Sequence, residues 1–96
     1  MKPIEPSTKP VFALGGIYAT PGVLEEVQHV ELTAALSRHA SGDWGDVCQD
    51  DWQANEEALT QDLRLFSVYV SSSGTKFWII TEADRSATTL LLPSEY

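Results

Sequence analysis

The stretch that decides the fold is RLFSVYVSSSGTKFWIIT, residues 64–81. Residues 64–70 and 75–81 are rich in β-branched and aromatic side chains that alternate with polar ones, which is typical of half-buried strands. The sequence Ser-Ser-Ser-Gly at residues 71–74 lies between them. A short glycine-containing loop of this kind joins two antiparallel strands. The sequence therefore predicts a β-hairpin, with one side of each strand facing a core.

A third strand is predicted after this hairpin. Residues 83–86 are polar and indicate a turn, and residues 87–92 (ATTLLL) have the composition of a strand. Pro93 ends that strand, because proline has no backbone N–H with which to continue a ladder. Three strands in succession, joined by short connections, predict an antiparallel meander.

A further strand is predicted near the start of the chain, at residues 11–19 (VFALGGIYA). Gly15 and Gly16 within it indicate a bulge or the close approach of another backbone. They do not form a phosphate loop, since neither GxGxxG nor GxxxxGK[ST] is present. Residues 1–10 hold three of the five prolines and predict an extended, flexible leader. We therefore expect a leader at residues 1–10 and a single domain at residues 11–96.

Three helices are predicted between the first strand and the hairpin. Thr20 is a hydroxyl cap and Pro21 suits the first helical position, so a short helix begins here. The next helix has apolar residues spaced three and four apart and ends at Gly42. The third is helical by propensity. The expected ranges are residues 21–28, 30–40 and 49–61.

The order β-α-α-α-β-β-β predicts a two-layer α+β domain in which the helices pack against the antiparallel C-terminal meander. We expect the first strand to join the same sheet, although the sequence does not indicate which strand it pairs with. Hydrophobic residues make up 43% of the 96 residues, which is typical of a globular chain.

The charge balance narrows the classes of partner. Fourteen Asp and Glu residues against six Lys and Arg give a net charge of -8. Direct contact with nucleic acid is not expected, because binding phosphates requires clustered cations. No apolar run approaches the roughly 18 residues of a membrane span, and residues 1–6 lack the apolar segment of a secretory signal. We therefore expect a cytoplasmic protein with no membrane contact.

The most unusual stretch is DWGDVCQDDWQANEEALTQD, residues 43–62, which holds seven of the fourteen acids and no Lys or Arg. Within its predicted helix, Trp52, Leu59 and Leu63 share one face, and we expect Trp52 and Trp78 to lie in the core. The acids on the other faces predict a surface that binds a protein partner. The candidate partner-binding residues are Asp43, Trp44, Asp46, Asp50, Asp51, Glu56, Glu57, Glu82 and Asp84.

Two of these assignments have alternatives. Trp44 lies among acids in a loop, so it is either an exposed contact residue or a core anchor for that loop. Glu82, Asp84 and Arg85 form either a turn with a local ion pair or a polar ledge beside the acidic helix.

Catalytic and metal-binding arrangements are weakly indicated. Cys48 and His39 could form a thiol and its base, but the surrounding acids disfavour a thiolate. His39, Asp43 and Asp46 could bind a metal with Asp50 and Asp51, yet their spacing matches neither an EF-hand nor HExxH. The single cysteine excludes a disulfide framework and a cysteine-based zinc site. We predict that the protein is not an enzyme and has no cofactor and no metal.

Three segments together resemble a known family: residues 16–22 (GIYATPG), 42–46 (GDWGD) and 78–89 (WIITEADRSATT). They are similar to a family of short bacterial proteins found on plasmids, phages and other mobile elements. Its members are called "plasmid-related protein" or "type I restriction endonuclease subunit M". A methyltransferase needs a cofactor-binding α/β domain, which this chain cannot house, so the resemblance implies only an association with mobile DNA. It implies no catalytic residues.

These observations favour a small, acidic, non-catalytic binding protein of a mobile element. The leading hypothesis is an inhibitor of a host defence nuclease complex, in the anti-restriction or anti-CRISPR class, whose acidic face imitates DNA phosphates. The alternatives are a regulatory or assembly partner without inhibitory action and a small metal- or thiol-dependent enzyme. The position of the acids separates them, because an inhibitor needs acids on an exposed face and an enzyme needs them converging in a pocket.

Overall fold

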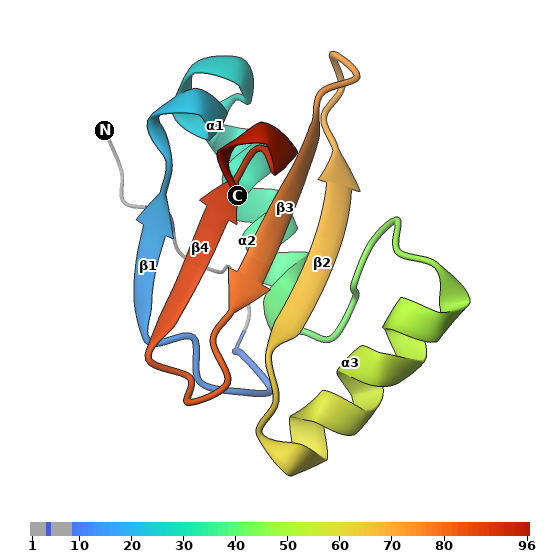
Figure 1. The fold of residues 1–96 in the computed structure, drawn as a ribbon. Helices are drawn as coiled ribbons and strands as arrows, with labels where there is room; N and C mark the ends of the chain where they lie inside the picture. Colours follow the sequence, from blue (N-terminus) through green and yellow to red (C-terminus); the bar gives the residue numbers. More distant parts are fainter. Residues whose placement is uncertain (1–3, 5–8) are drawn as a thin grey trace.

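The computed structural model describes Ile4 and residues 9–96, and Figure 1 shows their arrangement. The predicted α+β class and the order β-α-α-α-β-β-β are both confirmed. The expected leader lies almost wholly outside the described residues. The elements are β1 Gly16–Ala19, α1 Pro21–Glu26, α2 His29–Ala40, α3 Gln49–Gln61, β2 Leu65–Val70, β3 Lys76–Thr81, β4 Ala87–Leu91 and the single-turn 3-10 helix η1 Pro93–Glu95.

The four strands form one sheet in the order β1-β4-β3-β2. The predicted meander is confirmed, since β2, β3 and β4 pair antiparallel, and β1 joins it by pairing parallel with β4. β1 is shorter than the nine residues predicted, because the chain turns at Gly15, where φ is 65°. A Cβ at Gly15 would lie 2.3 Å from the Ser86 carbonyl oxygen, so the expected close backbone approach is confirmed.

The helices begin and end close to the predicted residues. The Val23 N–H donates to the Thr20 hydroxyl at the start of α1, and Gly42, with φ of 86°, follows α2. The bounds of α3 are those predicted. Among the described residues, no helix is long and apolar enough to cross a bilayer.

The main core lies between α2 and one face of the sheet, with α2 behind the sheet in Figure 1. α2 contributes Leu32 and Leu36, which are fully buried. The register places Tyr69, Phe77, Ile79 and Leu90 on the same side of β2, β3 and β4. Of the two isoleucines in β3, Ile79 therefore faces the main core.

The other face of the sheet has no long helix over it, and α3 lies beside β2 at the edge (Figure 1). The expected core position of Trp52 is wrong, since its side chain is 36% exposed, and Leu63 is 50% exposed. The reason is that α3 turns Asn55 and Ala58 toward the protein instead. The other expected core tryptophan, Trp78, is half-buried on the open face.

The backbone of the edge strand β2 is covered by groups from outside the sheet. The Asn55 side-chain amide donates to the Phe66 carbonyl at 2.7 Å and accepts from the Phe66 N–H at 3.0 Å. Next along the strand, the Val68 N–H donates to the Trp44 carbonyl, and the Val68 carbonyl accepts from the Asp46 N–H. These contacts satisfy edge groups that would otherwise be free to pair with another chain.

Candidate functional site

The loop before α3 is anchored in the core by Trp44. Its side chain is fully buried, stacks on Phe12 with ring centroids 6.1 Å apart and meets His39 edge-on at 5.6 Å. Its indole N–H donates to the Glu56 carboxylate at 3.0 Å. Of the two interpretations of Trp44, the core anchor is therefore the correct one. Its assignment to a partner-binding face is wrong.

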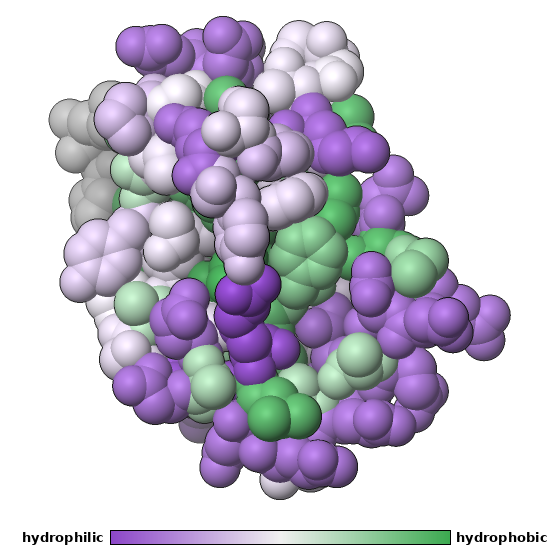
Figure 2. All heavy atoms as spheres, viewed as in Figure 1, coloured by the Kyte–Doolittle hydropathy of each residue, from purple (hydrophilic) through white to green (hydrophobic). Residues whose placement is uncertain are grey.

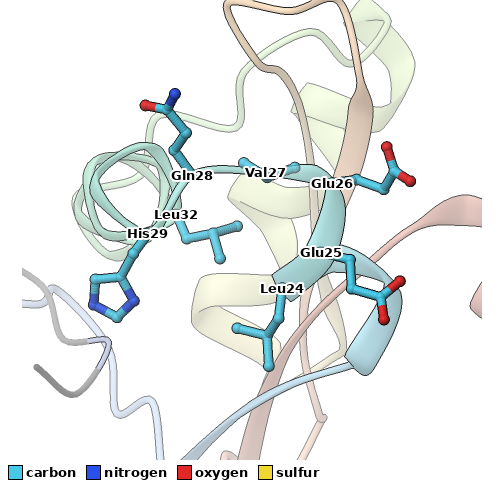
Figure 3. Close-up of a pocket in the computed structure, with 7 residues that line it drawn as sticks. All are labelled: Leu24, Glu25, Glu26, Val27, Gln28, His29 and Leu32. Atoms are coloured by element: carbon cyan, nitrogen blue, oxygen red, sulfur yellow. The ribbon is translucent and has the colours of Figure 1, made fainter. Parts of the chain in front are cut away.

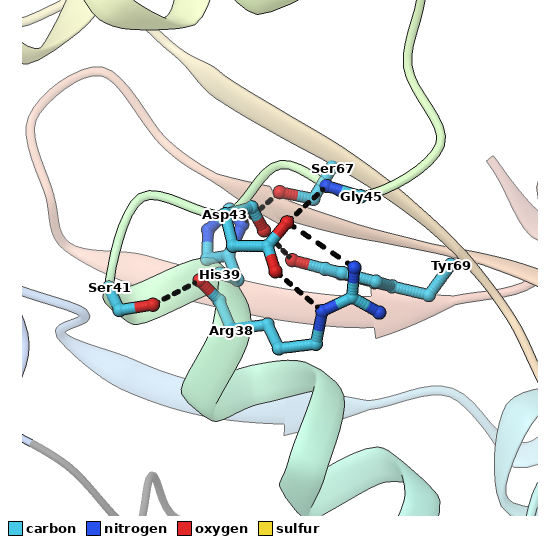
Figure 4. Close-up of polar contacts among 7 residues, drawn as sticks. All are labelled: Arg38, His39, Ser41, Asp43, Gly45, Ser67 and Tyr69. Carbon is cyan, nitrogen blue, oxygen red and sulfur yellow. Dashed lines mark hydrogen bonds and ion pairs between the residues drawn. The ribbon is translucent and has the colours of Figure 1, made fainter.

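Asp43 holds the same loop from the other side (Figure 4). Arg38 donates to its carboxylate at 2.8 and 3.3 Å, and the Gly45 N–H donates at 3.1 Å. The hydrogen bond from Arg38 is the main cause that lowers the pKa of Asp43 below its usual value. The Tyr69 hydroxyl donates to the Asp43 carbonyl at 2.6 Å. The carboxylate of Asp43 is thus already occupied within the protein.

The acids of α3 are arranged differently, because they are exposed and have few internal partners. The carboxylates of Asp50, Asp51 and Glu57 are exposed, as is that of Asp46 just before the helix. None of the four has a hydrogen-bond or ion-pair partner in the part of the chain that the structure describes. Asp50 and Glu57 are about two helical turns apart and so lie on one side of α3. Glu56 is exposed as well, although one oxygen accepts the Trp44 indole N–H.

The β3–β4 turn lies next to the C-terminal end of α3, and Arg85 makes the connection. Its guanidinium donates to the Leu63 carbonyl at 2.6 Å and the Ala58 carbonyl at 2.9 Å. The expected local ion pair in this turn is wrong, because the Arg85 guanidinium donates to these backbone carbonyls and forms no ion pair with a described carboxylate. Glu82 and Asp84 are left exposed, and a hydrogen bond from Ser86 lowers the pKa of Asp84. The polar ledge formed by these two acids stays a prediction.

A buried chain of hydroxyl groups surrounds His39. Its Nδ1 lies 2.5 Å from the Ser67 hydroxyl, and its Nε2 lies 2.9 Å from the Thr81 hydroxyl. The Thr81 hydroxyl is 2.7 Å from that of Thr88, which in turn donates to the Leu14 carbonyl at 2.7 Å.

The last acceptor, the Leu14 carbonyl, fixes the direction of the hydrogen bonds back to the His39 Nε2. Because the Thr88 hydroxyl donates to a carbonyl, Thr81 must donate to Thr88 and accept from the His39 Nε2–H. Burial keeps the imidazole neutral near pH 7, so the other ring nitrogen, Nδ1, carries no proton and accepts a hydrogen bond from the Ser67 hydroxyl. Burial is the main cause that lowers the pKa of His39 to about 3. His39 therefore has a structural role.

The structure does not bring together the candidate catalytic or metal-binding groups. Cys48 is exposed, whereas both nitrogens of His39 are buried and hydrogen-bonded to Ser67 and Thr81, so the thiol and the imidazole do not pair. Within Ile4 and residues 9–96, no three His, Cys, Asp or Glu side chains are grouped as metal ligands.

The surface hollows do not collect the α3 acids either. One hollow of about 240 Å³ is lined by residues of α1, α2 and the turn between them, and its Glu25 and Glu26 side chains point away from His29 (Figure 3). Two others lie between Arg38 and the end of β2. No α3 carboxylate lines any of these three hollows.

Sequence reasoning missed two functional groups of this region. Asn55 covers the strand edge, and Ser67 orients His39. Alternation along β2 could have placed Ser67 beside the inward-facing Tyr69, but nothing in the sequence indicated that its partner is a histidine 28 residues earlier.

Comparison with protein-family models, curated proteins and solved structures finds no match to this chain.

Proposed function

We propose that this protein is a non-catalytic binding module whose α3 surface binds the cationic nucleic-acid groove of a partner enzyme. The observation that carries the proposal is that three α3 acids are exposed and have no partner within the described part of the protein. Asp50, Asp51 and Glu57 are exposed, have no internal partner among the described residues, and line none of the three hollows described above. Acids in this arrangement favour contact with an outside surface over chemistry in a pocket.

The negative groups continue beyond α3 on both sides. Asp46 precedes the helix, and Arg85 holds the turn that bears Glu82 and Asp84 against the helix end. A row of carboxylates can occupy an Arg- and Lys-lined groove that has evolved for phosphates, and it speeds association electrostatically. The resemblance to proteins of mobile elements favours a host defence enzyme, such as a restriction or CRISPR complex, as the target. A mobile element gains when the host enzyme that attacks it is inhibited.

Capture from a bacterial lysate, with DNA as a competitor, tests the proposal. Immobilised native protein is exposed to a nuclease-treated lysate, and retained proteins are identified by mass spectrometry before and after washing with a DNA duplex. We expect retained nucleic-acid enzymes that the duplex releases, because both ligands occupy the same groove.

A matched pair of variants makes the test specific to α3. Asp50→Asn with Glu57→Gln removes two exposed charges from α3, and Glu25→Gln with Glu26→Gln removes two exposed charges from α1. The α3 variant should retain at least about tenfold less partner, and the α1 variant should behave like the native protein. Equal loss in both variants, or a partner that DNA does not release, would contradict the proposal.

A further inference from the structure

The cover on the edge of β2 stops before the strand ends. The Asn55 side chain and the loop before α3 bind the outward-facing backbone groups of Phe66 and Val68. Because every second residue of a strand directs its N–H and carbonyl to the same side, those of Val70 also point outward. Among the residues that the structure describes, no hydrogen-bond partner binds either group of Val70. The last residue of β2 is therefore an uncovered strand edge, on which another extended chain can pair.

The loop before α3 shows how a chain pairs with this edge. Gly45 forms a parallel β-bridge with Val68, after which the loop leaves β2 and α3 begins at Gln49. In Figure 1, the end of β2 and the turn that follows it extend beyond this loop and α3. The position beside Val70 is the next one along the same edge. A second extended segment at this position continues a pairing that the chain itself begins.

Space for side chains adjoins this edge. A hollow of about 390 Å³ is lined by Val70, Tyr69, Asp46 and other residues near the edge, and one of about 150 Å³ lies between Val70 and α2. Val70 is itself 51% exposed, and Figure 2 shows hydrophobic atoms at the surface along β2, bordered by the hydrophilic atoms of α3. Because successive side chains of a strand point to opposite faces, an added strand can place one side chain in a hollow and an apolar one beside Val70.

The charge in the larger hollow favours a basic segment. Arg38 lines this hollow, but its guanidinium is paired with the Asp43 carboxylate at 2.8 Å. The carboxylate of Asp46 is exposed and has no partner in the described part of the chain. Lys76, which is opposite Val70 in the register, lines neither hollow. The unpaired charge that these residues leave in the hollow is negative, so a Lys or Arg side chain complements it.

We propose that Val70 and Asp46 bind an extended basic segment of the partner protein, which adds to the four-stranded sheet at the edge of β2. The N–H and carbonyl of Val70 pair with the backbone of this segment, and one of its Lys or Arg side chains contacts Asp46. In such strand addition, backbone hydrogen bonds supply affinity and side-chain pockets supply specificity. The inference rests on the proposed function, because it gives the same cationic partner a second contact next to α3.

A synthetic peptide tests this contact without the partner enzyme. The probe is TVKVKVT, acetylated and amidated at its ends, which is titrated into the isotope-labelled native chain and followed by NMR. We expect the amide signals of Gly45, Val68 and Val70 to shift. Exchange of the Val70 N–H with solvent should slow, because that group gains an acceptor. The control peptide TVEVEVT should bind at least about threefold more weakly, since its charge repels Asp46.

Two variants separate the backbone contact from the charge. Val70→Pro deletes the outward N–H but leaves the ladder between β2 and β3 in place, and proline is tolerated at an edge position of this kind. It should weaken binding of TVKVKVT at least about tenfold, the effect of one lost hydrogen bond. Val70→Ala keeps the N–H and is the matched control, so it should retain most of the affinity. Asp46→Lys keeps the backbone bond to Val68 and should reverse the preference, so that TVEVEVT binds more tightly than TVKVKVT.

Three results would overturn the proposal: no shift at Val70 with TVKVKVT up to about 2 mM, equal affinity of the native chain and a folded Val70→Pro variant, or an unchanged preference in the Asp46→Lys variant. The peptide measurement and the capture of an enzyme from a lysate fail separately. An enzyme that is captured by a chain without peptide binding contradicts only the contact at Val70. Peptide binding without any captured enzyme contradicts only the proposed function.

Discussion

α2 and α3 are nearly equal in length but are held to the sheet by different forces. α2 buries Leu32, Ala35, Leu36, His39 and Ala40 against the inner face. α3 buries only Asn55 and Ala58, and its contacts with the rest of the chain include hydrogen bonds from Arg85 and Trp44 and those between Asn55 and Phe66. The comparison shows that a helix can be held by one small apolar contact, which Ala58 and Leu59 make with the cluster of Trp44 and Leu65, together with a few directed bonds, while its remaining surface stays exposed.

The largest effect is expected where α2 packs on the sheet. Ile79 is fully buried in the main core, and Ile79→Ala should lower the free energy of unfolding by about 2 to 5 kcal/mol through lost burial and a cavity. Denaturant melts measure the change. Val70→Ala, at a 51% exposed position on the same sheet, is the control and should stay within about 0.5 kcal/mol of the native chain. Equal melts for both variants would mean that the sheet faces are assigned the wrong way round.

The hydrogen bonds that attach α3 should contribute less to the free energy of unfolding than the packing at Ile79, and their loss should affect α3 more than α2. Asn55→Ala leaves the Phe66 N–H and carbonyl without their partners, which should cost about 2 to 3 kcal/mol. Amide hydrogen exchange should also rise across α3 more than across α2. Gln53→Ala, an exposed change in the same helix, should alter neither measurement. Unchanged exchange in the Asn55 variant would show that other contacts hold α3.

The buried imidazole of α2 should make stability depend on pH. In the unfolded chain His39 gains a proton below about pH 6.5, whereas burial lowers its pKa in the folded protein to about 3. The unfolded state therefore binds more protons between these values, and stability falls as the pH drops from 6.5 toward 3. The expected slope from this group is about 1.4 kcal/mol per pH unit.

The variant His39→Gln tests whether His39 causes this pH dependence of the free energy of unfolding. It lacks the titrating group, so its free energy of unfolding should change less between pH 6.5 and pH 4 than that of the native chain. Parallel pH profiles for the two proteins would assign the acid sensitivity to carboxylates instead.

The smallest effect on stability is expected from the acids of α3. Changing Asp50 and Asp51 to Asn and Glu56 and Glu57 to Gln should shift the free energy of unfolding by no more than about 1 kcal/mol per residue, because exposed charges contribute little. Loss of the favourable interaction of Asp50 and Asp51 with the helix N-terminus is opposed by relief of like-charge repulsion. Glutamine at position 56 keeps an oxygen for the Trp44 indole N–H. A large loss of stability in thermal melts would show that these acids are structural.

Much of the secondary structure could be predicted because it depends on local signals. The bounds of α3 follow from helix propensity, and the hairpin of β2 and β3 follows from alternation and the glycine of its turn. The short β1 could not be predicted, because Gly15 turns the chain only in response to the backbone of Ser86, 71 residues later.

The candidate site was predicted in part. The exposed acids of α3 follow from their composition, since charged side chains rarely leave water without a partner. Which tryptophan is buried does not follow, because Trp44 and Trp52 are equally apolar and both lie in the acidic stretch. Trp44 is buried because Phe12, His39 and Glu56 surround it, and these residues come from three separate segments: the stretch before β1, the end of α2 and the middle of α3.

The sequence alone therefore determined the order of the helices and strands and the excess of negative charge around α3. These properties depend on neighbouring residues and on composition. The tertiary structure decided that β1 pairs with β4, that Asn55 covers the edge of β2, and that α3 lies beside β2 at the edge of the sheet. Such features depend on contacts between residues far apart in the chain. Those contacts exist only after the sheet and the helices have packed together.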